Sequence, residues 1–469
     1  MSDRNSELMK NTIILSVGQI VPKLIAVFIL PLLTTFLTKK DYGLYELTLS
    51  VASFAIPLLS VQVQQGVFRF LLDKNTDKKA IITTSFSFIC VAFLLYAIPI
   101  IAAWTLYSAD VVLAVIFFGS YLAEVLLNWS GQVMRGLGDN IGYSIAYIIY
   151  SVVYIALLVV LLVAKSFLNV RDVAFAMICA YLIAFLFSIY KGRIISYCSI
   201  RCVDSGILRK LLNYSAPMVI SSISLWVVNL SDRFFVSGIL GIEMTAIYSV
   251  ANKIPNLFNS VYNIFNLAWT ENTSKLTFGE KNSGYYSKFF KDFYRVMVGM
   301  IIILTTASPI LFRVLINSQY TNGYWLMSWL FVGVFFSSLV SFFGSIYVGE
   351  KRTKDVGISS AVGAVMNVLI NLVFMKKYGV IIAAISTIVS YFIICVYRAV
   401  DIKKYVFIIY DRFTIVFGIA VVILVAALNN SFSIVTTMIS VIVSIAYNIV
   451  YNRHFVDGLI KKTLEKLVK

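Results

Sequence analysis

The sequence predicts an all-α membrane protein that crosses the bilayer about fourteen times. Its 469 residues are 60% hydrophobic and only 13% charged, and the mean hydropathy is +0.89. A soluble fold cannot bury that share of apolar side chains, whereas lipid can surround them. The apolar residues also come in long runs separated by short polar segments, as expected for a polytopic helical protein.

A transmembrane helix needs about 20 mainly apolar residues, and runs of roughly this length follow one another along the chain. The first ten residues are mostly polar, and the apolar run after them has no small-residue cleavage site. We therefore expect this first run to be a retained helix. The predicted spans are 11–37, 43–68, 80–104, 111–134, 140–164, 171–190, 211–240, 245–270, 289–316, 322–349, 356–376, 379–398, 412–428 and 432–451.

The charges in the loops predict the orientation. Most loop Lys and Arg residues fall on the side that holds both termini, which the positive-inside rule assigns to the cytoplasm. The net charge of +17 then reflects this topology and contact with anionic membrane lipids. Nucleic acid is not implied as a partner.

Several enzyme classes are disfavoured by the sequence. It holds neither a GxxxxGK[ST] phosphate-binding run nor a GxSxG nucleophile motif. The single histidine, His454, and the five scattered cysteines do not form a metal-binding pattern. The loops are too short for a soluble catalytic domain. We expect a protein that is not an enzyme and holds no cofactor, with protons or sodium ions as candidate coupling ions.

An internal repeat is indicated by residues 38–50 and 241–253, which each follow the end of one span and open the next. This predicts that the first six spans are repeated as the following six. Because six is even, the two halves run in the same sense, as in transporters with parallel repeats and a cavity between two bundles. The predicted organisation is a six-helix bundle over 1–200, a second over 201–400, and two further helices with a basic cytoplasmic tail over 401–469.

Five asparagines follow one helical face inside the apolar span 245–270, at spacings of 4, 3, 4 and 3. A carboxamide that faces hydrocarbon leaves its donors and acceptors unpaired, at several kcal/mol each. The stripe therefore predicts a polar, water-filled cavity for a solute rich in hydrogen-bonding groups. Its members are Asn252, Asn256, Asn259, Asn263 and Asn266.

Two charged residues are predicted to lie at similar depths near the middle of the membrane. Lys23 is in the first span and Glu124 is in the fourth, and each charge costs on the order of 3 kcal/mol to insert. Lys23 shares a helix face with Ser16 and Gln19, which favours a position lining a cavity. The two charges either flank this cavity, with Glu124 as a candidate ion-coupling group, or form a structural ion pair.

A second charged group is predicted near the outer ends of spans 7 and 8. Antiparallel packing of these spans would bring Asp232, Arg233 and Lys253 to one level. Asp232 could neutralise one cation, leaving the other for an anionic solute, or take part in ion coupling. The alternative is a fully paired cluster that joins the two helices. Asn367 and Asn371 in span 11 add a smaller polar face.

Gln62, Gln65 and Arg69 are predicted to share one face at the cytoplasmic end of span 2. Arg69 alone would be an ordinary positive-inside anchor. With glutamines above it, its guanidinium also suits the oxygens of a phosphate.

An aromatic stripe in span 5 consists of Tyr143, Tyr147, Tyr150 and Tyr154. Tyrosines at helical spacing are often packing residues. The alternative is a surface on which sugar rings stack and hydroxyls bind, with Tyr147 and Tyr150 as candidates.

Three segments resemble the bacterial polysaccharide-transporter family, the Wzx-type oligosaccharide flippases. They are PLLTTFLTKKDYGLYEL (31–47), LNYSAPMVISSISLWVVNLSDRFFVSGILG (212–241) and AIYSVANKIP (246–255). The family belongs to the multidrug/oligosaccharidyl-lipid/polysaccharide (MOP) superfamily, together with lipid II flippases and MATE drug exporters.

This resemblance implies two six-helix bundles in a V shape in the bacterial plasma (inner) membrane, working by alternating access. It implies export of undecaprenyl-pyrophosphate-linked oligosaccharide repeat units for O-antigen, capsule or exopolysaccharide, with lumenal cations at Lys23 and Lys253. Fourteen spans are more typical of the lipid II branch, where spans 13 and 14 could form a groove for the lipid tail.

The leading functional hypothesis is therefore a flippase for a polyprenyl-pyrophosphate-linked oligosaccharide, with a polysaccharide polymerase and a chain-length regulator as candidate partners. A lipid II flippase is the first alternative. A MATE-type drug exporter is disfavoured because the buried cations outnumber the carboxylates. A membrane-embedded sugar polymerase is disfavoured because the outer loops are short.

Overall fold

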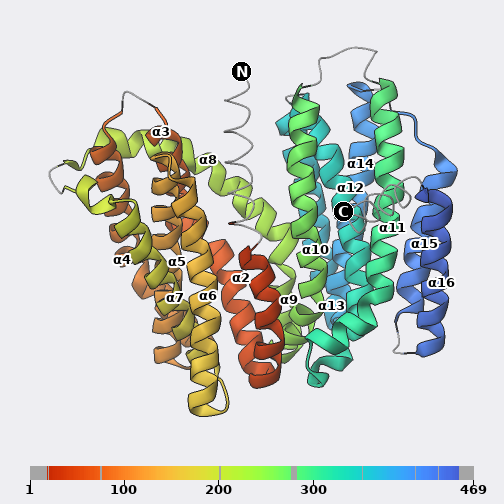
Figure 1. Ribbon diagram of the computed structural model, residues 1–469, viewed down its shortest axis with the longest axis horizontal. Coiled ribbons are helices and arrows are strands. Elements are labelled where there is room, and N and C mark those ends of the chain that lie inside the picture. The colour runs from red at the N-terminus through yellow and green to blue at the C-terminus, as the bar shows by residue number, and fades with distance from the viewer. Residues whose placement is uncertain are drawn as a thin grey trace, which may run out of the picture. The chain divides into compact units, whose positions relative to one another are not determined.

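The computed structural model describes residues 18, 21–73, 76–199, 202–275, 283–350, 352–406, 408–430 and 433–453. Over these residues the chain is almost entirely helical and contains no strand (Figure 1). The predicted all-α fold class is confirmed.

The chain divides into two compact units, Met1–Trp226 (unit 1) and Val227–Lys469 (unit 2). The boundary falls near the end of helix α8. The internal repeat of six spans stays a prediction. Unit 1 begins with the helix Val21–Phe36 and continues with α2 (Lys39–Leu59), α3 (Val63–Leu71), α4 (Lys78–Ser108), α5 (Val111–Gly136), α6 (Asn140–Lys165), α7 (Val170–Lys191), the 3₁₀ turn η1 (Ile194–Tyr197) and most of α8 (Ser205–Leu230). Unit 2 holds α9 (Asp232–Leu240), α10 (Ile242–Lys275), α11 (Ser283–Leu315), η4 (Ser318–Gly323), α12 (Tyr324–Gly349), α13 (Thr353–Tyr378), α14 (Ile381–Asp401), η5 (Ile402–Lys404), α15 (Arg412–Leu428) and α16 (Ile434–Tyr451).

Ten helices of the described part are long and apolar enough to cross a membrane, and Val21–Phe36 and Arg412–Leu428 are shorter apolar helices. The chain is thus a multi-pass membrane protein. The two remaining predicted spans, 211–240 and 245–270, also lie on helices.

Two predicted spans are each divided into two helices. Span 43–68 breaks after Leu59, where Val61 and Gln62 adopt left-handed φ angles of 46° and 52°. This conformation costs roughly 1–2 kcal/mol per non-glycine residue. Gln62 therefore does not continue the helical face of Gln65 and Arg69, which corrects the predicted continuous stripe. Span 211–240 breaks at Ser231, directly before Asp232.

Buried tryptophans join the helices of unit 1. Trp129 on α5 is 1% exposed and donates to Ser85 Oγ on α4 over 2.9 Å. Trp104 on α4 donates to the Tyr121 hydroxyl over 3.1 Å. These bonds satisfy the indole N–H groups inside an apolar interior.

Helix α12 is the centre of unit 2, since nearly all of its side chains are buried, including Phe331, Phe335 and Phe342. A helix that is apolar on all sides is expected in such a position. Phe342 stacks on Trp269 of α10, with ring centroids 4.9 Å apart. The predicted additional helices pack on α11, where the Tyr294 hydroxyl donates to the carbonyl of Ile415 over 2.6 Å.

Arg398 on α14 ties three helices of unit 2 together. It is 3% exposed and donates to the carbonyl of Val340 on α12 over 2.8 Å. It also donates to Ser359 Oγ and the carbonyl of Val356 on α13. These neutral oxygens satisfy the buried guanidinium of Arg398.

Candidate functional site

The candidate site in unit 2 is built around the buried carboxylate of Asp232, the first residue of α9. Asp232 is 3% exposed, and its Oδ2 accepts hydrogen bonds from the Tyr248 hydroxyl over 3.0 Å and from Thr387 Oγ1 over 2.8 Å. Its Oδ1 accepts from Asn371 Nδ2 over 2.8 Å. Neutral donors from α10, α13 and α14 thus surround the carboxylate.

Two fully buried asparagines on α13 extend this network. The amide nitrogen of Asn371 also donates to Asn367 Oδ1 over 3.1 Å, and Asn367 Nδ2 donates to Ser386 Oγ over 3.3 Å. Among the described residues, the buried Oδ1 of Asn371 has no hydrogen-bond partner. A carboxylate together with neutral oxygens can hold a proton or a small hard cation.

Three members of the asparagine stripe line a small cavity beside Asp232. The cavity is also lined by Tyr248, Ser337 and Thr387. Because its volume is about 30 Å³, it has room for about one water molecule or one small ion. The stripe residues in its wall are Asn252, Asn256 and Asn259.

The remaining two stripe residues lie differently. Asn266 faces α12, where its Oδ1 accepts from Ser345 Oγ over 3.0 Å, and Asn263 is exposed. The five asparagines of the stripe therefore do not all line the same cavity.

The two predicted cations lie near this cluster. Arg233 is 6% exposed, and its Nε donates to Ser249 Oγ on α10 over 2.9 Å. Lys253, one helical turn beyond Ser249, is half-buried. Because Asp232 and Arg233 contact Tyr248 and Ser249, the start of α9 lies against the first turns of α10, as antiparallel packing requires.

Unit 1 contains a second polar cavity, with a volume of about 320 Å³. It lies between the α2–α3 break and one face of α5. Its polar lining is Ser53, Gln62, Gln64, Gln65, Glu124, Asn128 and Gln132. The structure thus brings together the predicted residues Gln62, Gln65 and Glu124.

Glu124 lies within hydrogen-bonding reach of Asn128 and Tyr181. The predicted tyrosine stripe on α6 borders this region. Tyr147 donates to Asn128 Oδ1 over 2.6 Å, and Tyr150 stacks on Tyr181 with centroids 4.2 Å apart. Both rings therefore pack within unit 1, and Tyr147 also holds Asn128 of the cavity wall.

Three predicted residues lie away from these two cavities. Lys23 is exposed on the helix Val21–Phe36, and no ion pair joins it to Glu124 in the described part of the chain. Arg69 is exposed and pairs with Asp73 over 2.8 Å. Gln19 falls outside the described residues.

Sequence reasoning missed several lining residues. One face of α5 carries a polar residue every four positions, at Glu124, Asn128 and Gln132. This helical spacing could have indicated Asn128 and Gln132 from the sequence. Tyr248 precedes Asn252 by four residues and shares the face of the asparagine stripe on α10, so the spacing of the stripe could have indicated it.

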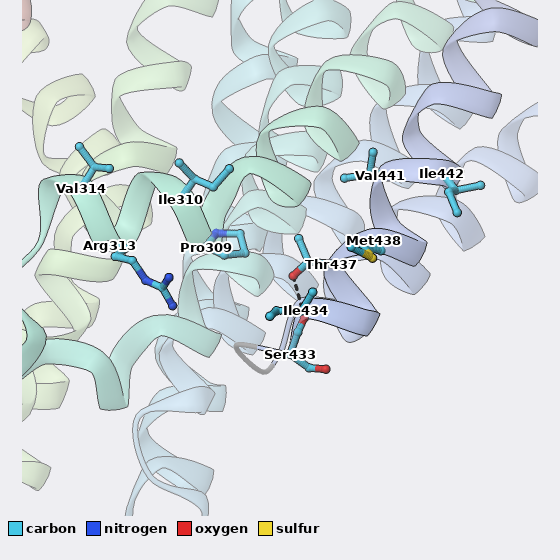
Figure 2. Close-up of a pocket in the computed structure, with 10 residues that line it drawn as sticks. All are labelled: Pro309, Ile310, Arg313, Val314, Ser433, Ile434, Thr437, Met438, Val441 and Ile442. Atoms are coloured by element: carbon cyan, nitrogen blue, oxygen red, sulfur yellow. Dashed lines mark hydrogen bonds between the residues drawn. The ribbon is translucent and has the colours of Figure 1, made fainter.

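A groove of about 580 Å³ lies between α11 and α16 (Figure 2). Its lining is mainly apolar, and Figure 2 shows that it comes from two helices. The residues are Pro309, Ile310, Arg313, Val314, Ser433, Ile434, Thr437, Met438, Val441 and Ile442. Arg313 is the charged residue of this group.

Known structures share the fold. The structure of a lipid II flippase, MurJ in an inward closed conformation, is similar with a TM-score of 0.72 and 16% identity, covering 96% of this chain and 100% of that chain. An outward-facing multidrug resistance MATE family transporter of the MOP superfamily has a TM-score of 0.56 and 14% identity, covering 85% and 95%. A MOP superfamily transporter from Pyrococcus furiosus has a TM-score of 0.52 and 15% identity, covering 85% and 95%. No curated protein sequence matches at a significant level.

The chain therefore shares its helical fold with these solved structures, and at 14–16% identity the similarity is one of fold. A family model described as polysaccharide biosynthesis protein matches residues 8–270, more than half of the sequence. The chain belongs to this polysaccharide biosynthesis family.

Proposed function

We propose that the protein is a flippase for undecaprenyl-pyrophosphate-linked oligosaccharide repeat units. It moves them from the cytoplasmic to the outer leaflet of the bacterial inner membrane, by alternating access and without enzymatic chemistry. The observation that carries this proposal is the polar cavity of about 320 Å³ inside unit 1 of a polysaccharide biosynthesis family member. Buried hydrogen-bonding groups can replace the hydration of a carbohydrate head group during its passage.

The cationic residues are proposed to balance the pyrophosphate. Lys23 and Arg69 are exposed in unit 1, and Arg233 and Lys253 lie in unit 2. A guanidinium fork or an ammonium group suits phosphate oxygens.

Asp232 is proposed to bind the coupling ion. Its carboxylate lies beside the unpartnered Oδ1 of Asn371 and the hydroxyl of Thr387. A proton on Asp232 or a sodium ion among these oxygens would neutralise the buried charge. Loading or release of the ion would then shift the balance between conformations of unit 2.

The groove between α11 and α16 supports a site for the lipid tail (Figure 2). Apolar contacts from Ile310, Val314 and Met438 suit a polyprenyl chain, which gains about 0.8 kcal/mol per buried CH₂ group. The tail would remain in the lipid phase while the head group moves.

The orientation with both termini in the cytoplasm, and the partners polymerase and chain-length regulator, belong to the same proposal. A lipid II-type flippase is the second candidate, because the structural similarity to such a flippase covers nearly the whole chain.

Reconstitution would test the proposed function. The purified full-length chain is placed in liposomes with a labelled undecaprenyl-pyrophosphate oligosaccharide, and a membrane-impermeant glycosidase reports how much label reaches the outer leaflet. We expect faster exposure of the label than in protein-free liposomes. Movement of lipid II alone would favour the second candidate, and movement of neither lipid would refute both.

A further inference from the structure

We infer that the unit 1 cavity is a subsite for one uncharged sugar ring, whose neighbouring hydroxyl groups donate to the carboxylate of Glu124. This inference rests on the proposed function and names the part of the head group that unit 1 recognises. The cavity volume of about 320 Å³ lies at the lower end of the range of about 300–1,000 Å³ found for small-molecule sites.

The charge of the cavity argues against a phosphate. Glu124 is the charged residue among the described side chains that line it, and the others are amides, a hydroxyl and apolar groups. A phosphate would stand beside a carboxylate of like charge in a partly desolvated site. The pyrophosphate of the substrate is therefore excluded from this subsite, and a neutral group fits.

Hydrogen bonds within the protein fix which atoms of the Gln132 and Asn128 amides can serve a ligand. Arg135 donates to Gln132 Oε1 over 3.1 Å, and Tyr147 donates to Asn128 Oδ1 over 2.6 Å. With both amide oxygens engaged as acceptors, the NH₂ groups of Gln132 and Asn128 serve as donors. The wall along α5 thus offers two amide donors beside a carboxylate acceptor.

The opposite wall contains amides that bond to one another. Gln64 is 6% exposed, and its Nε2 donates to Gln62 Oε1 over 3.2 Å. The Oε1 of Gln64 is enclosed by the protein and has no partner among the described residues.

The backbone positions these amides at the cavity. Gln62 and Val61 both have left-handed φ angles, and this break places Gln62, Gln64 and Gln65 in the lining. Strained backbone of this kind is held at sites where geometry matters. Gln62 is fixed by a 3.0 Å bond from its Nε2 to Ser222 Oγ of α8.

Sugar hydroxyls fit this arrangement because each one both donates and accepts. Two adjacent hydroxyls can donate to the two oxygens of Glu124, and hydroxyls further round the ring can accept from the amides along α5. An ammonium group would engage the carboxylate but would leave the amide donor of Gln132 without an acceptor. The combination of a carboxylate acceptor with amide donors therefore favours a neutral polyhydroxylated ring as the ligand.

Saturation-transfer NMR on the full-length chain in nanodiscs tests this assignment with a panel of neutral methyl hexopyranosides. At least one should receive saturation on its ring protons. Glu124→Gln should weaken this binding about tenfold, since a hydrogen bond to a charged group contributes about 1.5–3 kcal/mol. Glu243→Gln, at the exposed start of α10, is the matched control and should bind as the wild type.

Ser53→Phe is a second variant that fills the cavity from an exposed position, and it should also remove the signal. Inorganic pyrophosphate at equal concentration should not displace the sugar. The assignment is overturned if no hexopyranoside binds, if both variants bind as the wild type, if pyrophosphate competes, or if only amino sugars bind. Wild-type flipping in liposomes with any of these results would reject the subsite while retaining the proposed function.

Discussion

Asn371 on α13 donates a 2.8 Å hydrogen bond to Asp232 on α9, although 139 residues separate them in the chain. The same asparagine keeps a buried oxygen without a partner among the described residues. A carboxylate and an unused amide oxygen thus lie side by side inside an apolar unit. This relationship supports a buried site for a proton or a small cation.

Asp232→Asn is expected to remove the coupling ion from unit 2. The amide is nearly isosteric but carries no charge, so a cation loses its one anionic ligand. Transport in liposomes should fall about tenfold or more, and its dependence on sodium or pH should disappear. Glu243→Gln should leave both unchanged. Full ion dependence in Asp232→Asn would exclude this carboxylate from coupling.

Lys23→Ala is expected to abolish surface polysaccharide while protein level and membrane insertion remain normal. The exposed ammonium group of Lys23 lies on the helix Val21–Phe36 and makes no ion pair with Glu124 in the described part of the chain. Its loss should therefore affect the anionic substrate more than the fold. Polymer measured on cells carrying the variant at wild-type amounts would remove Lys23 from the mechanism.

Ile442→Trp is expected to obstruct the groove between α11 and α16. The larger ring occupies space that the polyprenyl tail would otherwise fill. Flipping of a long-tailed substrate should slow severalfold, and that of a short-tailed analogue should change little. Ile445→Trp, exposed on the same helix but outside the groove lining, is the control. Equal slowing by both variants would contradict a tail site here.

Arg398→Met is expected to destabilise unit 2 by about 3 kcal/mol or more, because hydrogen bonds to charged groups contribute about 1.5–3 kcal/mol each. The change removes the guanidinium that donates to the carbonyls of Val340 and Val356. Thermal unfolding in detergent should show a lower midpoint. Arg412→Met, at an exposed helix start, should unfold near the wild-type temperature. Similar midpoints for both variants would show that Arg398 does not hold the three helices together.

Asp411 should make stability depend on pH in a defined window. Hydrogen bonds from Thr414, with the Lys291 ammonium 3.2 Å away, lower the pKa of Asp411 from about 3.8 to about 2. Because the folded state favours the carboxylate, its stabilising contribution is complete well above pH 3.8 and is lost as pH falls towards about 2. The midpoint difference between wild type and Asp411→Ala should stay constant from pH 7 to about 5 and shrink below that. A difference that grows on acidification would contradict this pKa.

The sequence predicted the polar residues of both cavities only in part. Gln62, Gln65 and Glu124 were expected, and they meet in one cavity, although the helix break at Val61 removes the continuous face that was expected. A left-handed pair of ordinary residues has no clear sequence signature, since such strain is maintained by the surrounding packing. The asparagine stripe was visible from its spacing, but its division between the cavity at Asn259 and the α12 contact of Asn266 was not.

Hydropathy and helical periodicity by themselves determined the all-α membrane fold, the succession of spans and the presence of polar faces within them. Both are local properties, because a helix is stable in the bilayer when its own length and composition match the hydrocarbon core. The tertiary structure alone decided which polar groups meet. Asp232 finds Thr387 and Asn371, and Arg398 finds the carbonyl of Val340, because buried donors and acceptors must be satisfied by whatever helices pack beside them.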